Sequence, residues 1–206
     1  PGFYDKVRDL EPDERAGLKK LPYSDAHWLE MTGSKGLYGA EGFTPLERVG
    51  ARPTLEVNGI WGGYTEEGAK TVLPALAHAK ISTRLVADQD WRDIESQLRA
   101  YLKQHVPADI AWELQMHSGG PGAIMDRKSK YMQAAVTALE EVFNKEVHFT
   151  REGGSVPVVG MLQEKLGVDS IMLGFGLPDD GIHGPNERQY LPNFYRGIET
   201  YIRFLT

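Results

Sequence analysis

Hydrophobic and polar positions follow two different periods along this chain. A period of two, typical of a strand with one buried face, covers Thr54–Ile60 and Ala75–Val86, and a third alternating segment covers Asp109–Met116. In the second strand one face would be apolar, and the opposite, polar face would carry His78, Lys80, Ser82 and Arg84. This pattern predicts antiparallel strands with one side against a core.

The helical period of 3.6 residues appears in four segments, and local signals mark their ends. Asp88 or Asp90 can cap the first helix and Pro107 ends it, while Gly167 stops the third. The four predicted helices are Trp91–Val106, Ser129–Phe143, Val156–Leu166 and Leu191–Leu205.

The order of these elements changes near His117–Gly122, where three glycines and a proline indicate a hinge. Before it, the order strand, strand, helix, strand predicts an antiparallel two-layer α+β domain over residues 1–118. After it, short strands at Glu146–Thr150 and Asp169–Phe175 alternate with helices, which predicts an α/β segment over residues 119–206.

Residues 1–50 are less regular. Short helices are predicted within Leu10–Pro22 and Asp25–Met31, and glycines then interrupt any period. A covering flap and a partly ordered leader both remain open for this region. The sequence begins Pro1-Gly2 without an initiator methionine or a signal peptide, so we expect a processed, truncated or internal piece.

Composition narrows the class of protein. The 206 residues carry a formal charge of -6 and 41% hydrophobic residues, without a basic patch or a long apolar run, so we expect neither nucleic acid nor a membrane as partner. Cysteine is absent, so a metal would need His, Asp or Glu ligands. Its absence is compatible with a cytoplasmic protein, which is our expectation.

A loop rich in Gly, Pro and Asp runs from Gly174 to Asn186 and contains His183. Ligands collect at the carboxyl ends of strands in open α/β sheets, so His183 is a candidate metal ligand or acid/base. The alternative is a solvated loop histidine. Asp179 and Asp180 are the other charged groups here, and the loop offers at most three ligands to a metal.

Two further segments have candidate binding residues. Ser155 follows Gly154 where a strand meets a helix, so it either contacts a substrate or caps the helix; it lacks the glycine pattern of a hydrolase nucleophile. Arg84 can bind a carboxylate with two hydrogen bonds or form a surface salt bridge. Thr71 is unremarkable on spacing alone.

Five blocks, in order, resemble the dinuclear zinc amidohydrolases, which include carnosine-type dipeptidases, acetylornithine deacetylase and succinyl-diaminopimelate desuccinylase. The dipeptidase branch is the most similar. The blocks are Pro53–Tyr64, Ala69–Pro74, Lys80–Val86, Arg151–Val158 and Asp179–Glu187.

The resemblance implies a catalytic α/β domain with two zinc ions and an inserted lid domain that forms a homodimer. Residues 1–118 would be the lid without its first strand, and 119–206 the end of a zinc exopeptidase-like catalytic domain. His183 would be a zinc ligand. Small peptides or N-acyl amino acids would be the substrates, bound by Thr71, Arg84, Gly154 and Ser155.

The family's other zinc ligands and its general base have no counterpart in this chain and would precede Pro1. The resemblance therefore implies no catalytic residue here, and we expect the isolated chain to be inactive. A non-catalytic dimerisation or binding module derived from the same fold is the alternative. An unrelated α/β binding protein would require the five blocks to be coincidental.

Overall fold

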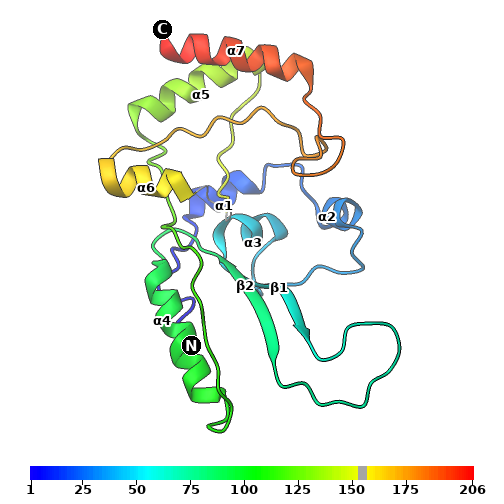
Figure 1. Cartoon of the computed structure of the whole chain (residues 1–206). Coiled ribbons are helices and arrows are strands. Elements are labelled where there is room, and N and C mark those ends of the chain that lie inside the picture. The colour runs from blue at the N-terminus through cyan, green and yellow to red at the C-terminus, as the bar shows by residue number, and fades with distance from the viewer. Residues whose placement is uncertain (153–156) are drawn as a thin grey trace. The chain divides into compact units, whose positions relative to one another are not determined.

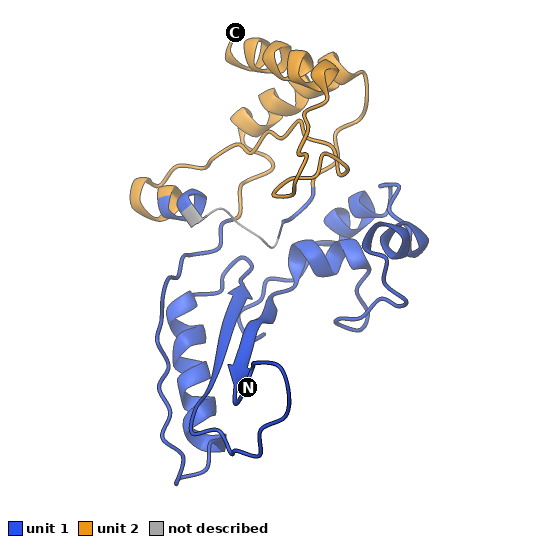
Figure 2. Cartoon of the chain, turned by 45° about the vertical axis from the view of Figure 1, so that its right-hand side comes forward, with its two compact units in different colours: residues 1–123, 150–161 blue, residues 124–149, 162–206 orange. Residues whose placement is uncertain are grey.

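The computed structural model describes residues 1–152 and 157–206, which form two compact units (Figure 2). Unit 1 contains Pro1–Ala123 and Thr150–Met161, and unit 2 contains Ile124–Phe149 and Leu162–Thr206. The chain thus leaves unit 1, builds part of unit 2 and returns to unit 1 before it completes unit 2. None of the described helices is both long and apolar enough to cross a membrane.

Unit 1 begins with three short helices, α1 (Pro12–Leu18), α2 (Asp25–Thr32) and α3 (Pro45–Ala51) (Figure 1). The first two were expected from the sequence. A small apolar core forms where α1 and α3 meet, and buried side chains of both helices contribute to it. This core consists of Leu10, Leu18 and Ala51, with Leu21 and Leu46 packed against it.

Helix α3 lies in the segment that the sequence analysis left irregular. The Thr44 hydroxyl accepts a hydrogen bond from the Glu47 N–H at 3.3 Å, and the Glu47 carboxylate accepts one from the Thr44 N–H at 2.7 Å. This reciprocal capping box, with Pro45 in the first turn, explains why a helix starts here despite the preceding glycines. Glu47 is buried and also binds Arg15 at 3.1 Å.

Arg151 joins the returning segment of unit 1 to its N-terminal helices. Its guanidinium donates to both carboxylate oxygens of Glu14, at 2.8 and 2.6 Å, and to the carbonyl of Arg8 at 3.2 Å. Both side chains of the ion pair are largely buried. The Arg151 carbonyl lies against Gly50 of α3, where an added Cβ would be only 2.0 Å from the oxygen. This contact requires glycine at position 50.

The sheet of unit 1 consists of the antiparallel strands β1 (Thr54–Gly62) and β2 (Ala77–Arg84), which confirms the two predicted strands. The register shifts between Val57 and Gly59, so Asn58 forms a bulge. Because side chains alternate, this extra residue places Ile60 on the same face as Val57. The apolar face of the sheet is formed by Leu55, Val57, Ile60, Ala79 and Ile81, and we call it the apolar sheet face.

The apolar sheet face is exposed, so the expectation that β2 is half-buried is wrong for this chain by itself. The predicted helix after β2 is confirmed as α4 (Trp91–His105), capped by Asp90. The predicted strand over 109–116 is not formed; this segment is extended and runs beside α4 (Figure 1). Arg99 binds the Leu114 carbonyl at 3.0 Å, and no described strand offers that segment a ladder.

Unit 2 is built on the packed helices α5 (Lys130–Phe143) and α7 (Leu191–Leu205), both predicted from the sequence. Ala135, Ala138 and Thr200 are buried in this unit, and Arg203 of α7 binds Glu141 of α5 at 2.9 Å. The helix predicted over Val156–Leu166 is α6 (Pro157–Leu166), within which the division between the units falls.

The predicted strands at 146–150 and 169–175 are wrong for the described chain, since both segments are extended without a ladder. The second segment packs against α7 instead. Asn193 donates to the Phe175 carbonyl at 3.2 Å, and the Phe175 ring lies against Gly197. A strand pattern alone does not provide the neighbouring strand that a sheet requires.

Candidate functional site

The loop between Phe175 and α7 carries the candidate metal ligand, and Asp180 ties its two ends together. The Asp180 carboxylate accepts a hydrogen bond from the Leu177 N–H at 2.7 Å. Its carbonyl accepts one from the Arg188 N–H at 2.9 Å, while the Arg188 Nε lies 3.6 Å from the second carboxylate oxygen. The segment from 177 to 188 is therefore closed at its base.

His183 lies between these ends in a left-handed backbone conformation, with φ of 63°. The Gly184 N–H donates to the Gly181 carbonyl at 2.8 Å, so His183 is in a tight turn. A positive φ is unfavourable for a residue with a Cβ, and such strained positions cluster at ligand-binding sites. The His183 side chain is exposed, as a metal ligand at an open site must be.

Asp180 does not join His183 as a ligand. Only 2% of its surface is exposed, and its carboxylate is directed to the base of the loop by the Leu177 N–H. Asp179 is exposed and binds Arg188. Among the described residues no three His, Asp or Glu side chains are grouped closely enough to hold a metal ion. His183 supplies a single donor, and zinc requires three or four protein donors.

The substrate-binding candidates lie in different parts of the chain. Arg84 is the last residue of β2, opposite Thr54, and Thr71 is exposed in the long connection that precedes β2. The two residues thus flank opposite ends of this strand within unit 1. Gly154 and Ser155 lie outside the described residues. His183 belongs to unit 2.

The Arg84 guanidinium is exposed, and it forms no ion pair with the part of the chain that the structure describes. Several other arginines do form such pairs, including Arg8 with Asp88 at 2.6 Å and Arg99 with Glu95 at 2.7 Å. The surface salt bridge that was the alternative for Arg84 is therefore not formed within the described chain. The group is available to an external carboxylate.

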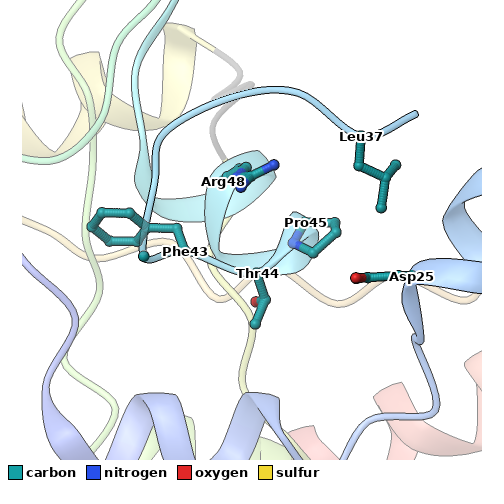
Figure 3. A pocket seen from close by; sticks show the side chains of 7 residues that line it. Asp25, Leu37, Phe43, Thr44, Pro45 and Arg48 are labelled. Atoms are coloured by element: carbon teal, nitrogen blue, oxygen red, sulfur yellow. The ribbon is translucent and has the colours of Figure 1, made fainter.

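A separate pocket of about 360 Å³ lies in unit 1, between α2 and α3 (Figure 3). Arg48 lines it and donates to the Ala40 carbonyl at 2.9 Å, while Asp25 and Leu37 lie on the side away from Phe43. None of the predicted site residues lines this pocket. The pocket could not be predicted from the sequence, because the irregular segment before α3 forms part of its wall.

The buried role of Asp180 was also missed from the sequence. An acid next to a glycine in a turn is common, and neither residue type reveals that the carboxylate faces inward. Arg188 is the signal that was available, because a cation eight residues later can close the loop that contains both residues.

Comparison with known proteins places these features in a family. Residues 11–110 match the peptidase dimerisation domain of the M20 family. The chain is 31% identical over 205 residues to the Cys-Gly metallodipeptidase of Candida albicans, and 26% identical over 211 residues to human Beta-Ala-His dipeptidase. These alignments cover 97% and 99% of this chain but only 42% and 41% of the relatives.

Solved structures agree with the sequence relatives. An M20 family metallo-carboxypeptidase from Sulfolobus solfataricus matches with a TM-score of 0.86 at 29% identity, over 99% of this chain and 46% of that one. Human carnosine dipeptidase 1 matches with a TM-score of 0.79 at 26% identity, over 99% and 44%. The chain spans less than half the length of the relatives it matches.

The predicted resemblance and fold class are thus confirmed, although three of the predicted strands are absent from the described residues. The sequence relatives are metal-dependent dipeptidases that align with both units of this chain. The chain belongs to the M20 metallopeptidase family, whose dimerisation domain it carries.

Proposed function

We propose that this chain is the lid and the C-terminal catalytic part of a metal-dependent hydrolase of dipeptides or N-acyl amino acids. The alignment of nearly the whole chain with a Cys-Gly metallodipeptidase and with Beta-Ala-His dipeptidase carries this proposal. In it, residues 1–118 are the lid, which forms a homodimer, and residues 119–206 complete the catalytic domain.

His183 is proposed to hold zinc. The exposed imidazole suits zinc chemically, and the left-handed turn fixes its backbone. The described residues provide no second and third donor nearby, so the remaining ligands of a two-zinc centre would come from polypeptide beyond these 206 residues. When bound, such zinc polarises a scissile carbonyl and activates water.

The other candidate residues act on the substrate in this proposal. Arg84 holds the substrate carboxylate, because its guanidinium is exposed and not engaged by an acid of the described chain. Thr71 donates a hydrogen bond from the exposed connection before β2, and Gly154 and Ser155 contact the substrate. In this proposal the general base also comes from polypeptide beyond these 206 residues, so the isolated chain is proposed to be inactive.

The test uses the polypeptide encoded by the complete reading frame, loaded with zinc. We expect hydrolysis of Cys-Gly or β-Ala-His, and a His183→Ala variant should lose zinc and activity together. His105→Ala is the matched control, since this exposed histidine stacks on Tyr101 of its own helix α4 and belongs to unit 1. Full zinc occupancy in His183→Ala would exclude its role as a ligand.

A non-catalytic dimerisation or binding module is the second candidate. It is favoured by the match of residues 11–110 to a dimerisation domain and by the lack of a three-donor group among the described side chains. This candidate predicts a dimer that neither retains zinc nor hydrolyses dipeptides when the complete reading frame is expressed. The same measurements therefore separate the two functions.

A further inference from the structure

The carboxylate of Asp180 is buried in a loop whose other charged side chains are exposed. One oxygen accepts from the Leu177 N–H at 2.7 Å. The other oxygen has no hydrogen bond within the described chain and lies 3.6 Å from the Arg188 Nε. Burying a carboxylate is unfavourable unless hydrogen bonds and a cation compensate for the lost water.

Asp180 contacts both ends of one segment through its backbone as well as its side chain. Its N–H donates to the Leu177 carbonyl at 3.1 Å, and its carbonyl accepts from the Arg188 N–H at 2.9 Å. Arg188 in turn binds the exposed carboxylate of Asp179. We call this set of contacts between Leu177, Asp180 and Arg188 the loop staple.

The loop staple encloses the turn that carries His183. Between Asp180 and Arg188 the hydrogen bond from Gly184 to Gly181 closes the turn, and Ile182 next to His183 is 62% exposed. Neighbouring packing therefore contributes little to holding the turn. The backbone of His183 remains in its left-handed conformation because the two ends of the segment are fixed.

We propose that Asp180 is a positioning residue, which fixes the backbone that presents His183 before a metal ion binds. This inference rests on the proposed function, in which His183 is a zinc ligand. Residues that orient a metal ligand without touching the metal commonly change metal affinity by 10–100-fold when they are replaced. In this proposal the loop staple orients His183 indirectly, because it fixes the backbone on both sides of this residue.

The test compares zinc affinity, measured by competition with a chelator, in variants of the polypeptide from the complete reading frame. Asp180→Ala should bind zinc about 10–100-fold more weakly than the parent. Asp180→Asn keeps an acceptor for the Leu177 N–H but loses the ion pair with Arg188. Its zinc affinity should therefore fall between that of the parent and that of Asp180→Ala. Asp179→Ala removes the neighbouring exposed acid and should stay within about threefold of the parent.

A second measurement follows the loop in the 206-residue chain itself. Amide exchange should accelerate in both Asp180 variants at Leu177 and Arg188, whose N–H groups donate to Asp180, and at Gly184, whose N–H donates to the Gly181 carbonyl inside the loop staple. Exchange at all three amides should stay unchanged in Asp179→Ala. If circular dichroism shows that Asp180→Ala does not fold, the zinc affinity of Asp180→Asn tests the positioning role instead. A role in folding alone would change amide exchange and leave zinc affinity unaltered.

The outcomes separate the two proposals. If His183→Ala weakens zinc binding and neither Asp180 variant does, the positioning role is refuted while the ligand role of His183 stands. If His183→Ala leaves zinc affinity unchanged, the proposed function fails at this residue, and the positioning role fails with it.

Discussion

The role proposed for Arg84 depends on the lack of an acidic partner among the described residues. Its guanidinium stands at the end of β2, exposed and without an acid among the described residues, while Arg151 and Arg203 are both paired. Since an arginine presents two parallel N–H donors to a carboxylate, an unpaired one beside an open strand end suits a substrate carboxylate.

For Arg84 we expect a specific kinetic change in the enzyme from the complete reading frame. Arg84→Ala should raise KM for dipeptides with a free carboxylate by about 10- to 150-fold, since a charge-assisted contact contributes about 1.5–3 kcal/mol. Zinc content should not change. Steady-state kinetics with Arg92→Ala as a control tests this, because Arg92 pairs with Asp90 of its own helix cap and lies over the ring of its neighbour Trp91. An unaltered KM in Arg84→Ala would remove this residue from the substrate site.

Single residues differ in how far the sequence predicts their roles. His183 was predicted as a candidate metal ligand because its residue type and the neighbouring glycine can be read directly from the sequence. The inward direction of Asp180 was not, because it depends on Leu177 and Arg188 meeting in space. A carboxylate is placed by its partners, and a linear sequence does not give their distances.

At the scale of elements, helices were predicted well, whereas only two of the five predicted strands are found among the described residues. The boundaries of α4, α5 and α7 agree with the predicted segments to about a residue, because helical period and caps such as Asp90 and Ser129 are local. A strand needs a neighbour, and the segments at 109–116, 146–150 and 169–175 have none among the described residues. Helix α3 was overlooked although its Thr-Pro-Leu-Glu start is a local signal.

Two helical glycines give a matched test of element packing. Gly50→Ala should destabilise unit 1 by about 1–3 kcal/mol, because its Cβ would overlap the Arg151 carbonyl. Gly17→Ala in α1 meets no atom within 4 Å and should stabilise it by about 0.5–1 kcal/mol. Urea unfolding followed by tryptophan fluorescence measures this, since Trp28, Trp61, Trp91 and Trp112 all lie in unit 1. Equal midpoints for the two variants would contradict the contact between α3 and Arg151.

At the scale of the whole molecule, the apolar sheet face is the feature that a monomer does not explain. Leu55, Val57 and Ile60 are each at least half exposed on β1. Exposed apolar side chains that share one face indicate an association surface, and homo-oligomers usually pair such a face with its own copy. The match to a dimerisation domain covers this sheet.

Self-association through the apolar sheet face has a direct test in the 206-residue chain. We expect a concentration-dependent dimer in sedimentation velocity, and Val57→Lys should shift it to monomer, since a buried unpaired ammonium disfavours the interface. Val49→Lys is the control, because Val49 of α3 is 54% exposed and Val57 is 57% exposed. A dimer that survives Val57→Lys would place the interface elsewhere.

The ion pair between Glu14 and Arg151 has a consequence for biosynthesis. Glu14 emerges from the ribosome 137 positions before its partner, and the Gly50 contact with the Arg151 carbonyl is likewise incomplete until then. At usual translation speeds several seconds pass between the synthesis of α1 and α3 and that of Arg151. During this time Glu14 lacks its arginine partner, and the face of α3 that carries Gly50 is not covered. Chaperones that recognise such intermediates would therefore act on this chain before Arg151 has been synthesised.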